Sequence, residues 1–319
     1  MPQSQLDRPT AATQFYEWKD YRCAYEVHHS SDDASTPPLL LIHPIGVGLS
    51  RWFWHPFCQT WIDSHYPGTL YNPDLLGCGE SDMPRAAYYP NDWASQLLHF
   101  VKTVIQQPVV LVSQGALFPV ALQMLQQMQD EAWIHGLVLS GPPGWSLITQ
   151  DVKPRQKMLL WNLLFDSPFG NVFYRYARRK AFLDSFSRRQ LFAREHVSEN
   201  PIEGAWLERL QEGSEDMATR HAVFSFLAGF WRVDYTKAIE AVQQPTFVLF
   251  GDEASGIDRV SKMESAQERL NDYLKHMPNA QGKLIAGRNV MPYESTKIFT
   301  KETAQWVNAL GQRDGGVPD

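Results

Sequence analysis

Residues 72–82 read Asn-Pro-Asp-Leu-Leu-Gly-Cys-Gly-Glu-Ser-Asp and continue the short run Thr69–Asn72. A Pro-Asp pair ends this run, and two glycines then give the chain the freedom to turn sharply. Short unbroken runs rich in apolar residues are typical of strands that are buried on both faces of a parallel sheet. The other runs of this kind are Leu39–Ile42, Val109–Val112, Ile134–Leu139, Phe247–Phe250 and Lys283–Ala286.

Helical periodicity separates these runs. Between residues 93 and 104 the apolar side chains recur on one helical face, and Asn91 or Asp92 is placed to cap the helix. Residues 117–128 repeat the pattern, while Phe15–His28 predicts a pair of strands near the N-terminus. Alternating strands and helices indicate an α/β fold in which right-handed crossovers join parallel strands.

The alternation stops between Ser140 and Gln244, where aromatic and leucine residues recur at helical spacing and no strand-like run occurs. Roughly a hundred residues are too many for a plain connection, so we expect a helical cap inserted into the α/β core. The resulting division is residues 1–142 for the first part of the core, 143–243 for the cap, 244–311 for the second part of the core and 312–319 for a flexible tail.

The composition excludes several classes of protein. A formal net charge of -6 and a pI near 5.9 disfavour a nucleic-acid-binding protein, which needs a basic face. Cys23, Cys58 and Cys78 are too few and too scattered for a disulfide framework or a metal site, so we expect a reducing compartment and neither metal nor cofactor. The chain has no recognisable secretory signal or membrane-spanning segment, which predicts a soluble cytoplasmic protein.

Four segments resemble landmarks of the α/β-hydrolase superfamily, in its capped, epoxide-hydrolase- and esterase-like branch. Leu41–Gly46 is similar to the family's His-Gly turn, residues 72–82 to its Asp-x-x-Gly-x-Gly-x-Ser segment, and Leu111–Ala116 to its nucleophile elbow. Met291–Glu294 is similar to the segment that follows the catalytic histidine. The resemblance covers almost the whole chain and implies a mostly parallel eight-stranded sheet flanked by helices, with a helical cap inserted after the sixth strand.

The same resemblance implies that the catalytic triad of the family is missing. Gly115 stands in the slot of the nucleophile, Ala254 in that of the acid and Val290 in that of the histidine. Glycine has no side chain that could attack a substrate, and no histidine follows His276. A serine hydrolase loses several orders of magnitude in rate when any member of its triad is removed, so these slots are expected to be vestigial.

Parts of a binding site are expected to survive. By position, the backbone N–H groups of Ile45 and Ala116 match the two donors of the family's oxyanion hole. The cap offers aromatic and leucine side chains that could cover an apolar ligand, and an arginine in the pocket could bind a ligand carboxylate. The candidates for lining the pocket are His43, Ser113, Gln114, Glu253 and Arg288.

Each polar candidate has a structural alternative. His43 could hold its own loop in place, Ser113 could bond to nearby backbone, and Arg288 could be an exposed loop residue. A basic group in the cap could contact an acidic protein or anionic lipid headgroups at a membrane surface, although a charged run is usually a solvated helix face. Its members are Arg175, Arg178, Arg179 and Lys180, with Arg188 and Arg189 nearby.

Three stretches also resemble a narrower subgroup. They are His43–Gly48, Tyr71–Met83 and Arg288–Glu294. The subgroup occurs in cyanobacteria and plastids, so the resemblance implies a protein of the cytoplasm or the plastid stroma. It implies no particular substrate.

Three hypotheses for the function are open at this point. The first is a non-catalytic protein that binds a small apolar or carboxylate ligand, or a protein partner. The second is a hydrolase or lyase that acts on a small ester or apolar substrate with relocated catalytic groups. The third is a structural or assembly factor with a closed pocket, which Leu117 and Phe118 help to fill. The candidate groups for relocated chemistry are His43, Cys78, Ser113, Glu253 and Glu294.

Overall fold

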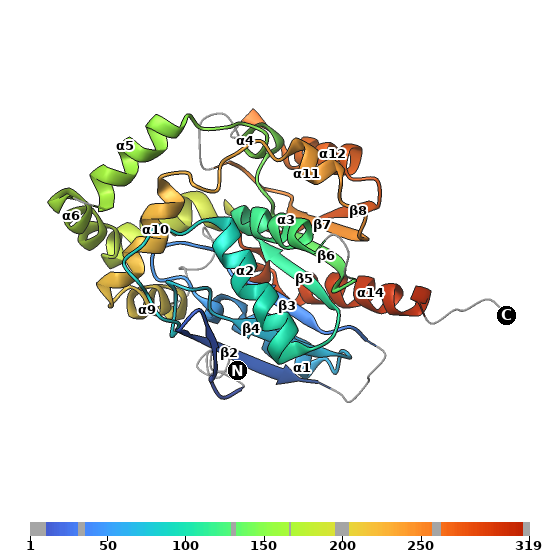
Figure 1. The fold of residues 1–319 in the computed structure, drawn as a ribbon. Helices are drawn as coiled ribbons and strands as arrows, with labels where there is room; N and C mark the ends of the chain where they lie inside the picture. Colours follow the sequence, from blue (N-terminus) through green and yellow to red (C-terminus); the bar gives the residue numbers. More distant parts are fainter. Residues whose placement is uncertain are drawn as a thin grey trace.

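The computed structural model describes residues 11–30, 36–128, 132–165, 167–194, 204–256 and 263–314. Its strands are β1 Gln14–Trp18, β2 Tyr21–His29, β3 Leu39–Ile42, β4 Thr69–Pro73, β5 Val109–Gln114, β6 Ile134–Ser140, β7 Thr246–Gly251 and β8 Ala280–Ile285. They form one sheet in the order β1-β2-β4-β3-β5-β6-β7-β8 (Figure 1). The pairs β1–β2 and β2–β4 are antiparallel and the other neighbouring pairs are parallel. The mostly parallel eight-stranded sheet is therefore confirmed.

Helices cover both faces of the sheet. The core helices are α1 His55–Asp63, α2 Pro90–Phe100, α3 Phe118–Gln127, α12 Ala266–His276, α13 Met291–Glu294 and α14 Thr296–Asp314. Side chains alternate across a strand, so Leu111 of β5 packs with residues of α2 and α3, whereas Val110 packs with residues of α1 and α14. Both faces are buried, which is why the strands of this sheet are almost uniformly apolar.

The helical insertion lies between β6 and β7, which confirms a cap after the sixth strand. Its helices are α4 Trp145–Ile148, α5 Pro154–Phe165, α6 Pro168–Ala177, α7 Lys180–Phe186, α9 Gly204–Gly213, α10 Arg220–Leu227 and α11 Thr236–Glu240. α4 contacts α12 and α11 contacts α3, while α5, α6, α9 and α10 stand together at one end of the sheet (Figure 1). Within the described residues, none of the helices combines the length and the apolar character that crossing a membrane requires.

The last strand and the last helix differ from the prediction. β8 begins at Ala280 and ends at Ile285, because backbone hydrogen bonds to β7 extend it beyond the apolar run that marked it. α14 continues to Asp314, so the first residues of the expected flexible tail are helical. Residues 315–319 lie outside the described part of the chain.

The start of α2 also differs. The helix begins at Pro90, and Tyr89 is its N-cap residue. Asp92 is the third helical residue, where its carboxylate accepts a 3.0 Å hydrogen bond from the backbone N–H of Tyr89. A proline suits the first turn, because its missing N–H would have no partner there.

Candidate functional site

The turn between β5 and α3 is sharp and opens onto free space. β5 ends at Gln114, and Gly115 adopts a φ of +59° at the start of the short helix η4 Gly115–Leu117. A Cβ atom on Gly115 would meet nothing within 4 Å apart from its chain neighbours. Leu117 and Phe118, expected to help fill the space above Gly115, pack in the core with α2 and α3 instead.

Gln114 joins this turn to the loop that follows β8. Its side-chain amide donates a 2.7 Å hydrogen bond to the carbonyl of Asn289. The Asn289 side chain donates to the carbonyl of Ser255 at 3.0 Å and accepts from the N–H of Ser255 at 3.4 Å. The loops after β5, β7 and β8 therefore meet, and the neighbouring Ala254 and Val290 are 8% and 4% exposed.

A segment of the cap is bonded to these loops through its backbone. We call residues 189–194 the cap strap. The backbone N–H of Asn289 donates to the carbonyl of Leu191 at 3.0 Å, and its side chain donates to the carbonyl of Gln190 at 2.6 Å. Asn289 thus links the turn after β5, the loop after β7 and the cap.

Two candidate carboxylates also hold the cap strap. Glu253 accepts a 2.9 Å hydrogen bond from the backbone N–H of Arg194. Glu294 accepts a short hydrogen bond from the N–H of Ala193. Glu294 accepts a second hydrogen bond, of 2.9 Å, from the N–H of Arg288. Both carboxylates therefore attach the cap to the core.

Arg288 reaches the same region. Its guanidinium donates to the hydroxyl of Ser255 at 3.0 and 2.6 Å and to the carbonyl of Arg189 at 2.8 Å. Burial, and then the charge of Arg194, lower the pKa of Arg288. The guanidinium of Arg288 is therefore held by a hydroxyl and a carbonyl of neighbouring loops.

Four aromatic rings close the contact between the cap and the core. We call Trp52, Phe192, Trp206 and Tyr293 the aromatic cluster. The ring centroids of Trp206 and Tyr293 are 4.6 Å apart, and Trp206 lies 5.2 Å from Phe192 and 5.3 Å from Trp52. Phe192 and Trp206 belong to the cap, whereas the other two belong to the core.

His43 is a buried structural residue in the turn after β3. Its Nε2 accepts a 3.0 Å hydrogen bond from the backbone N–H of Leu75, and its Nδ1 lies 2.9 Å from the carbonyl of Pro44. Those two contacts require a neutral ring that carries its proton on Nδ1. Burial lowers the pKa of His43, which favours this neutral form.

Ser113 and Cys78 lie inside the core. Ser113 is 2% exposed. Because side chains alternate along β5, Ser113 points to the same face of the sheet as Leu111, which is the face covered by α2 and α3. Within the described chain its hydroxyl has no hydrogen-bond partner, so the expected bond to nearby backbone is not formed. Burial raises the pKa of the Cys78 thiol, which disfavours the reactive thiolate.

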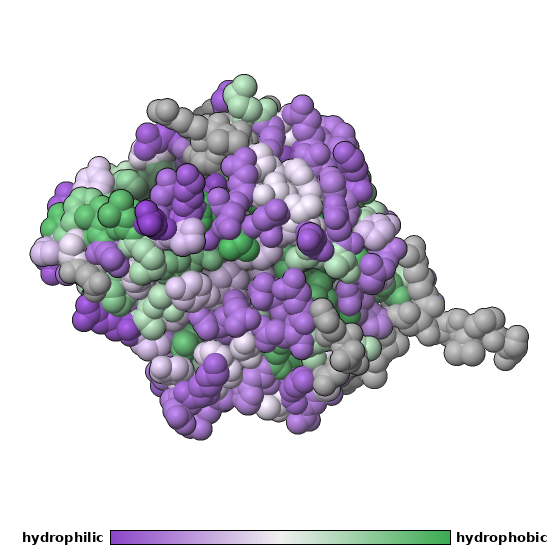
Figure 2. All heavy atoms as spheres, turned by 45° about the horizontal axis from the view of Figure 1, so that its top comes forward, coloured by the Kyte–Doolittle hydropathy of each residue, from purple (hydrophilic) through white to green (hydrophobic). Residues whose placement is uncertain are grey.

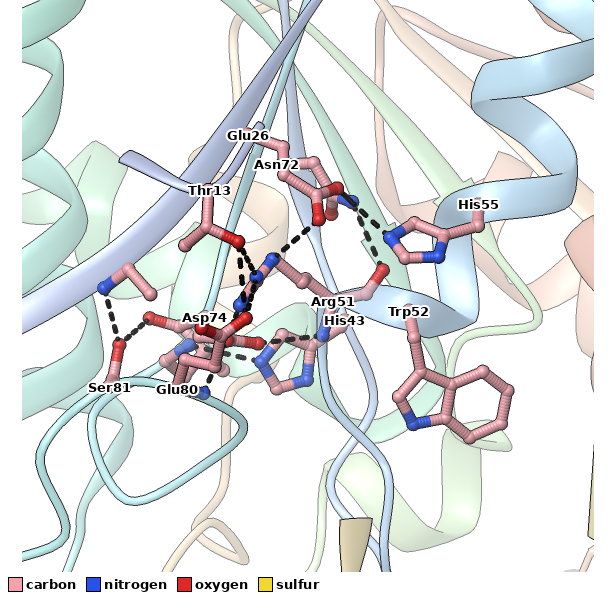
Figure 3. Close-up of polar contacts among 12 residues, drawn as sticks. Thr13, Glu26, His43, Arg51, Trp52, His55, Asn72, Asp74, Glu80 and Ser81 are labelled. Carbon is pink, nitrogen blue, oxygen red and sulfur yellow. Dashed lines mark hydrogen bonds and ion pairs between the residues drawn. The ribbon is translucent and has the colours of Figure 1, made fainter. Parts of the chain in front are cut away.

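A buried charged group lies beside His43, and the sequence reasoning missed it (Figure 3). We call Glu26, Arg51, Asp74 and Glu80 the Arg51 cluster, in which the first three are buried and Glu80 is exposed. Arg51 Nε donates to Glu26 at 3.0 Å, and the guanidinium makes short contacts with Asp74 and Glu80. The backbone N–H of Arg51 also donates to Asp74 at 2.8 Å. The cluster therefore ties the loop after β4 to η2 Arg51–Trp54, the helical turn that precedes α1.

Besides Arg51, Glu26 contacts three further side chains. It contacts His55 Nε2 at 2.9 Å and the side-chain amide of Asn72 at 3.3 Å (Figure 3). It also contacts His28 Nε2 at 3.2 Å. Burial alone would raise the pKa of the Glu26 carboxyl. The hydrogen bonds from both histidines and the charge of Arg51 outweigh burial and hold this pKa well below its usual range.

One sequence signal could have revealed the cluster. Glu26 interrupts an apolar strand, and Arg51 directly precedes the run Trp52-Phe53-Trp54. Charged residues inside apolar runs are almost never fully buried unless they are paired. Separately, no three His, Cys, Asp or Glu side chains in the described ranges are arranged to hold a metal ion.

Comparison with known proteins identifies the family. Residues 39–299 match the model of the alpha/beta hydrolase family. The chain belongs to this family. No curated protein matches the chain in sequence.

Solved structures of two esterases and an enol-lactonase share the fold at low identity. A thermophilic esterase from Thermogutta terrifontis is 18% identical, with a TM-score of 0.68 over 95% of this chain and 100% of its own. An enol-lactonase from Burkholderia xenovorans LB400 is 11% identical, with a TM-score of 0.68 over 92% of this chain and 100% of its own. An esterase from Exiguobacterium antarcticum is 14% identical, with a TM-score of 0.69 over 93% and 100%. These likenesses establish the fold alone.

Proposed function

We propose that this alpha/beta hydrolase family member is non-catalytic and binds a small ligand over the turn at Gly115. The observation that carries the proposal is the combination of a left-handed φ of +59° with open space where a nucleophile's side chain would stand. A strained strand-to-helix turn is what the family uses to present its serine. Here the turn presents backbone alone.

The partners of a nucleophile are replaced as well. Ala254 and Val290 lie on the loops after β7 and β8 and offer no acid and no base. His43 has both ring nitrogens engaged by backbone groups. An ester bound above Gly115 would meet neither an attacking group nor a proton acceptor, so the protein retains the ligand unchanged.

The chemistry around the turn defines the ligand class. The backbone N–H groups of Ile45 and Ala116 suit an oxygen with partial or full negative charge. The aromatic and leucine side chains of the cap are the groups that we propose to cover an apolar body. We therefore propose a small ligand with a carbonyl or carboxylate end and an apolar body.

Two measurements on the unmodified protein test the loss of catalysis. A panel of short- and medium-chain acyl esters gives no turnover, and intact-mass measurement after fluorophosphonate treatment finds no adduct. Turnover together with an adduct on Ser113 or Cys78 would establish relocated chemistry and overturn the proposal.

Ligand binding is tested with a matched pair of variants. Both Gly115→Ala and Gly115→Leu impose the same backbone strain, but only leucine fills the space. Thermal shifts produced by a panel of fatty and aromatic carboxylates persist in Gly115→Ala and disappear in Gly115→Leu. Equal binding by the two variants would place the ligand elsewhere.

A second candidate function is an assembly factor with a permanently closed cap. The aromatic cluster and the backbone bonds of the cap strap favour it, because they hold the cap on the core. Under this alternative no ligand of the panel shifts the unfolding temperature of the wild-type protein.

We also propose a cellular location for the protein. The resemblance to the cyanobacterial and plastid subgroup points to the cytoplasm or the stroma. Fractionation of cells that carry a tagged full-length chain checks this, and an exclusively periplasmic or extracellular signal would contradict it.

A further inference from the structure

Helices α5 and α6 expose apolar side chains that the described part of the chain does not cover. In α5, Trp161 and Leu164 are buried in the cap, but Leu159 is 74% exposed. In α6, Tyr174 is buried and Val172 is 65% exposed. We call the exposed set the cap surface. Its members are Met158, Leu159, Leu160 and Leu163 of α5 and Phe169, Val172 and Tyr176 of α6.

The cap surface forms a visible patch. Figure 2 shows apolar residues gathered at one side of the molecule, over the position that α5 and α6 occupy in Figure 1. Apolar patches of this kind on soluble proteins mark protein or membrane contacts. α5 is apolar on its buried and its exposed sides, which is typical of a helix whose outer side is also removed from water.

The charge around the cap surface has the opposite sign to that of the whole chain. Residues 153–194 contain ten lysines or arginines and only two acidic residues, although the full chain has 29 basic and 35 acidic residues. Arg175 follows Val172 by three positions and shares its helical face, and Arg179 lies two residues beyond the end of α6. Basic residues beside exposed Leu, Phe and Tyr are the composition of an interfacial helix.

A depression lies at the end of α6, where the Arg179 guanidinium is 5.7 Å from the ring centroid of Tyr176 in the cap surface. It has a volume of about 670 Å³ and is lined by Arg175, Arg178, Arg179, Gln211, Glu215 and Met217. Arg178 is held by the carbonyls of Ser214 and Glu215, each at 3.1 Å. Arg175 and Arg179 are exposed. Two guanidinium groups thus face outward at the edge of the cap surface, where they can meet phosphate groups.

We infer that the cap surface docks on an anionic lipid bilayer, with the α5 and α6 side chains inserted among the acyl chains and Arg175 and Arg179 on the headgroup phosphates. Charge favours this occupant over a second copy of the chain. A symmetric dimer through the cap surface would place each basic rim against itself. An anionic membrane instead attracts every basic residue of the segment. The inference is independent of the proposed ligand site at Gly115.

Sedimentation of the full chain with vesicles tests the inference. The protein binds vesicles of phosphatidylcholine with about 30% phosphatidylglycerol and does not bind phosphatidylcholine alone, and salt of about 0.5 M weakens the binding. Leu159→Ser with Val172→Ser lowers partitioning roughly tenfold or more. The matched control is Ile298→Ser, which changes an exposed apolar residue of α14 outside the cap surface.

Charge-reversal substitutions provide a second test of the inference. Arg175→Glu with Arg179→Glu lowers partitioning by roughly tenfold or more, whereas Lys275→Glu with Lys301→Glu on other helices leaves it within about twofold. All the substituted side chains are exposed, and circular dichroism confirms that each variant is folded.

Two results would overturn the inference. One is failure of the wild-type protein to sediment with the anionic vesicles. The other is a dimer, detected by light scattering, that Leu159→Ser dissociates, because the cap surface would then belong to a second copy.

Discussion

The side-chain amide of Gln114 and the backbone carbonyl of Asn289 form a 2.7 Å hydrogen bond between positions 175 residues apart in the chain. The bond joins the end of β5 to the loop after β8. In Gln114→Leu the carbonyl of Asn289 loses this partner, so we expect the free energy of unfolding in urea to fall by about 1 kcal/mol. The exposed change Gln126→Leu is the control and alters stability by less than about 0.5 kcal/mol.

Glycine substitutions separate backbone strain from steric conflict. Gly115→Ala needs a left-handed alanine but meets no atom, so we expect a loss of about 1 kcal/mol in unfolding free energy. Gly48→Ala also has a left-handed backbone, and its Cβ would lie 1.9 Å from the carbonyl oxygen of Leu210. We expect Gly48→Ala to cost about 3 kcal/mol or more. Equal losses would contradict the open space over Gly115.

Substitution of Arg51 tests how strongly the folded state depends on the positive charge beside the buried carboxylates. Arg51→Met leaves Glu26 and Asp74 buried without their partner, and we expect the unfolding free energy to fall by about 3–5 kcal/mol. Arg188→Met breaks a partly exposed pair with Asp184 and costs less than about 1 kcal/mol. A small effect of Arg51→Met at neutral pH would mean that water or neighbouring groups replace the guanidinium.

We expect protonation of Glu26 to lower the free energy of unfolding in acid. Its pKa in the folded protein lies below the ordinary value of 4.5, so the folded state favours the charged carboxylate. The contribution of the Glu26 carboxylate to the free energy of unfolding is complete above pH 4.5. It is lost as the pH falls through the lowered pKa. Urea titrations from pH 7 to pH 3 should therefore show a decline below pH 4.5 that is shallower in Glu26→Gln. An unchanged slope in the variant would assign the decline to other carboxylates.

We expect His221 to affect the free energy of unfolding at higher pH than Glu26 does. Burial, then the charges of Arg220 and Arg85, lower its pKa from 6.5 to about 4. The folded state favours the neutral ring of His221. The contribution of this ring to the free energy of unfolding is therefore complete above pH 6.5 and is lost as the pH falls toward 4. We expect His221→Gln to flatten the stability profile between pH 6.5 and 4.5. NMR titration of the ring checks the pKa directly, and a midpoint near 6.5 would contradict the assignment.

Asn289 controls how tightly the cap strap is held. Asn289→Ala removes its side-chain bonds to Gln190 and Ser255. We expect the backbone amides of Ala193 and Arg194 to exchange with deuterium at least about tenfold faster, because the strap opens more often. Asn271→Ala, an exposed change on α12, leaves these amides unchanged. Unaltered exchange in Asn289→Ala would mean that the aromatic cluster alone holds the cap.

The sequence predicted the elements that carry a local signal. Buried strands appear as apolar runs, and the long insertion without such runs predicted the cap. The Asn289 contacts left no comparable signal, because polar pairs between distant positions have no period in the sequence. The Arg51 cluster left only single charges beside apolar residues, which do not identify their partners. The cap surface was missed for a different reason. Leu159 lies in the kind of apolar stripe that usually packs inward, and only the arrangement of α5 on the cap leaves it exposed.

The direct pairing of β6 with β7, in register from Leu137–Thr246 to Ser140–Leu249, has an architectural consequence. The strand before the insertion and the strand after it are adjacent, so the chain leaves the sheet and returns to it at neighbouring points. An insertion of this kind is an exchangeable module. A short linker can replace it, or a relative's cap can be grafted in, without altering the hydrogen bonding of the sheet. The proposed lipid-docking surface lies wholly on this insertion, in α5 and α6, so it can be altered without changing how the core strands pair.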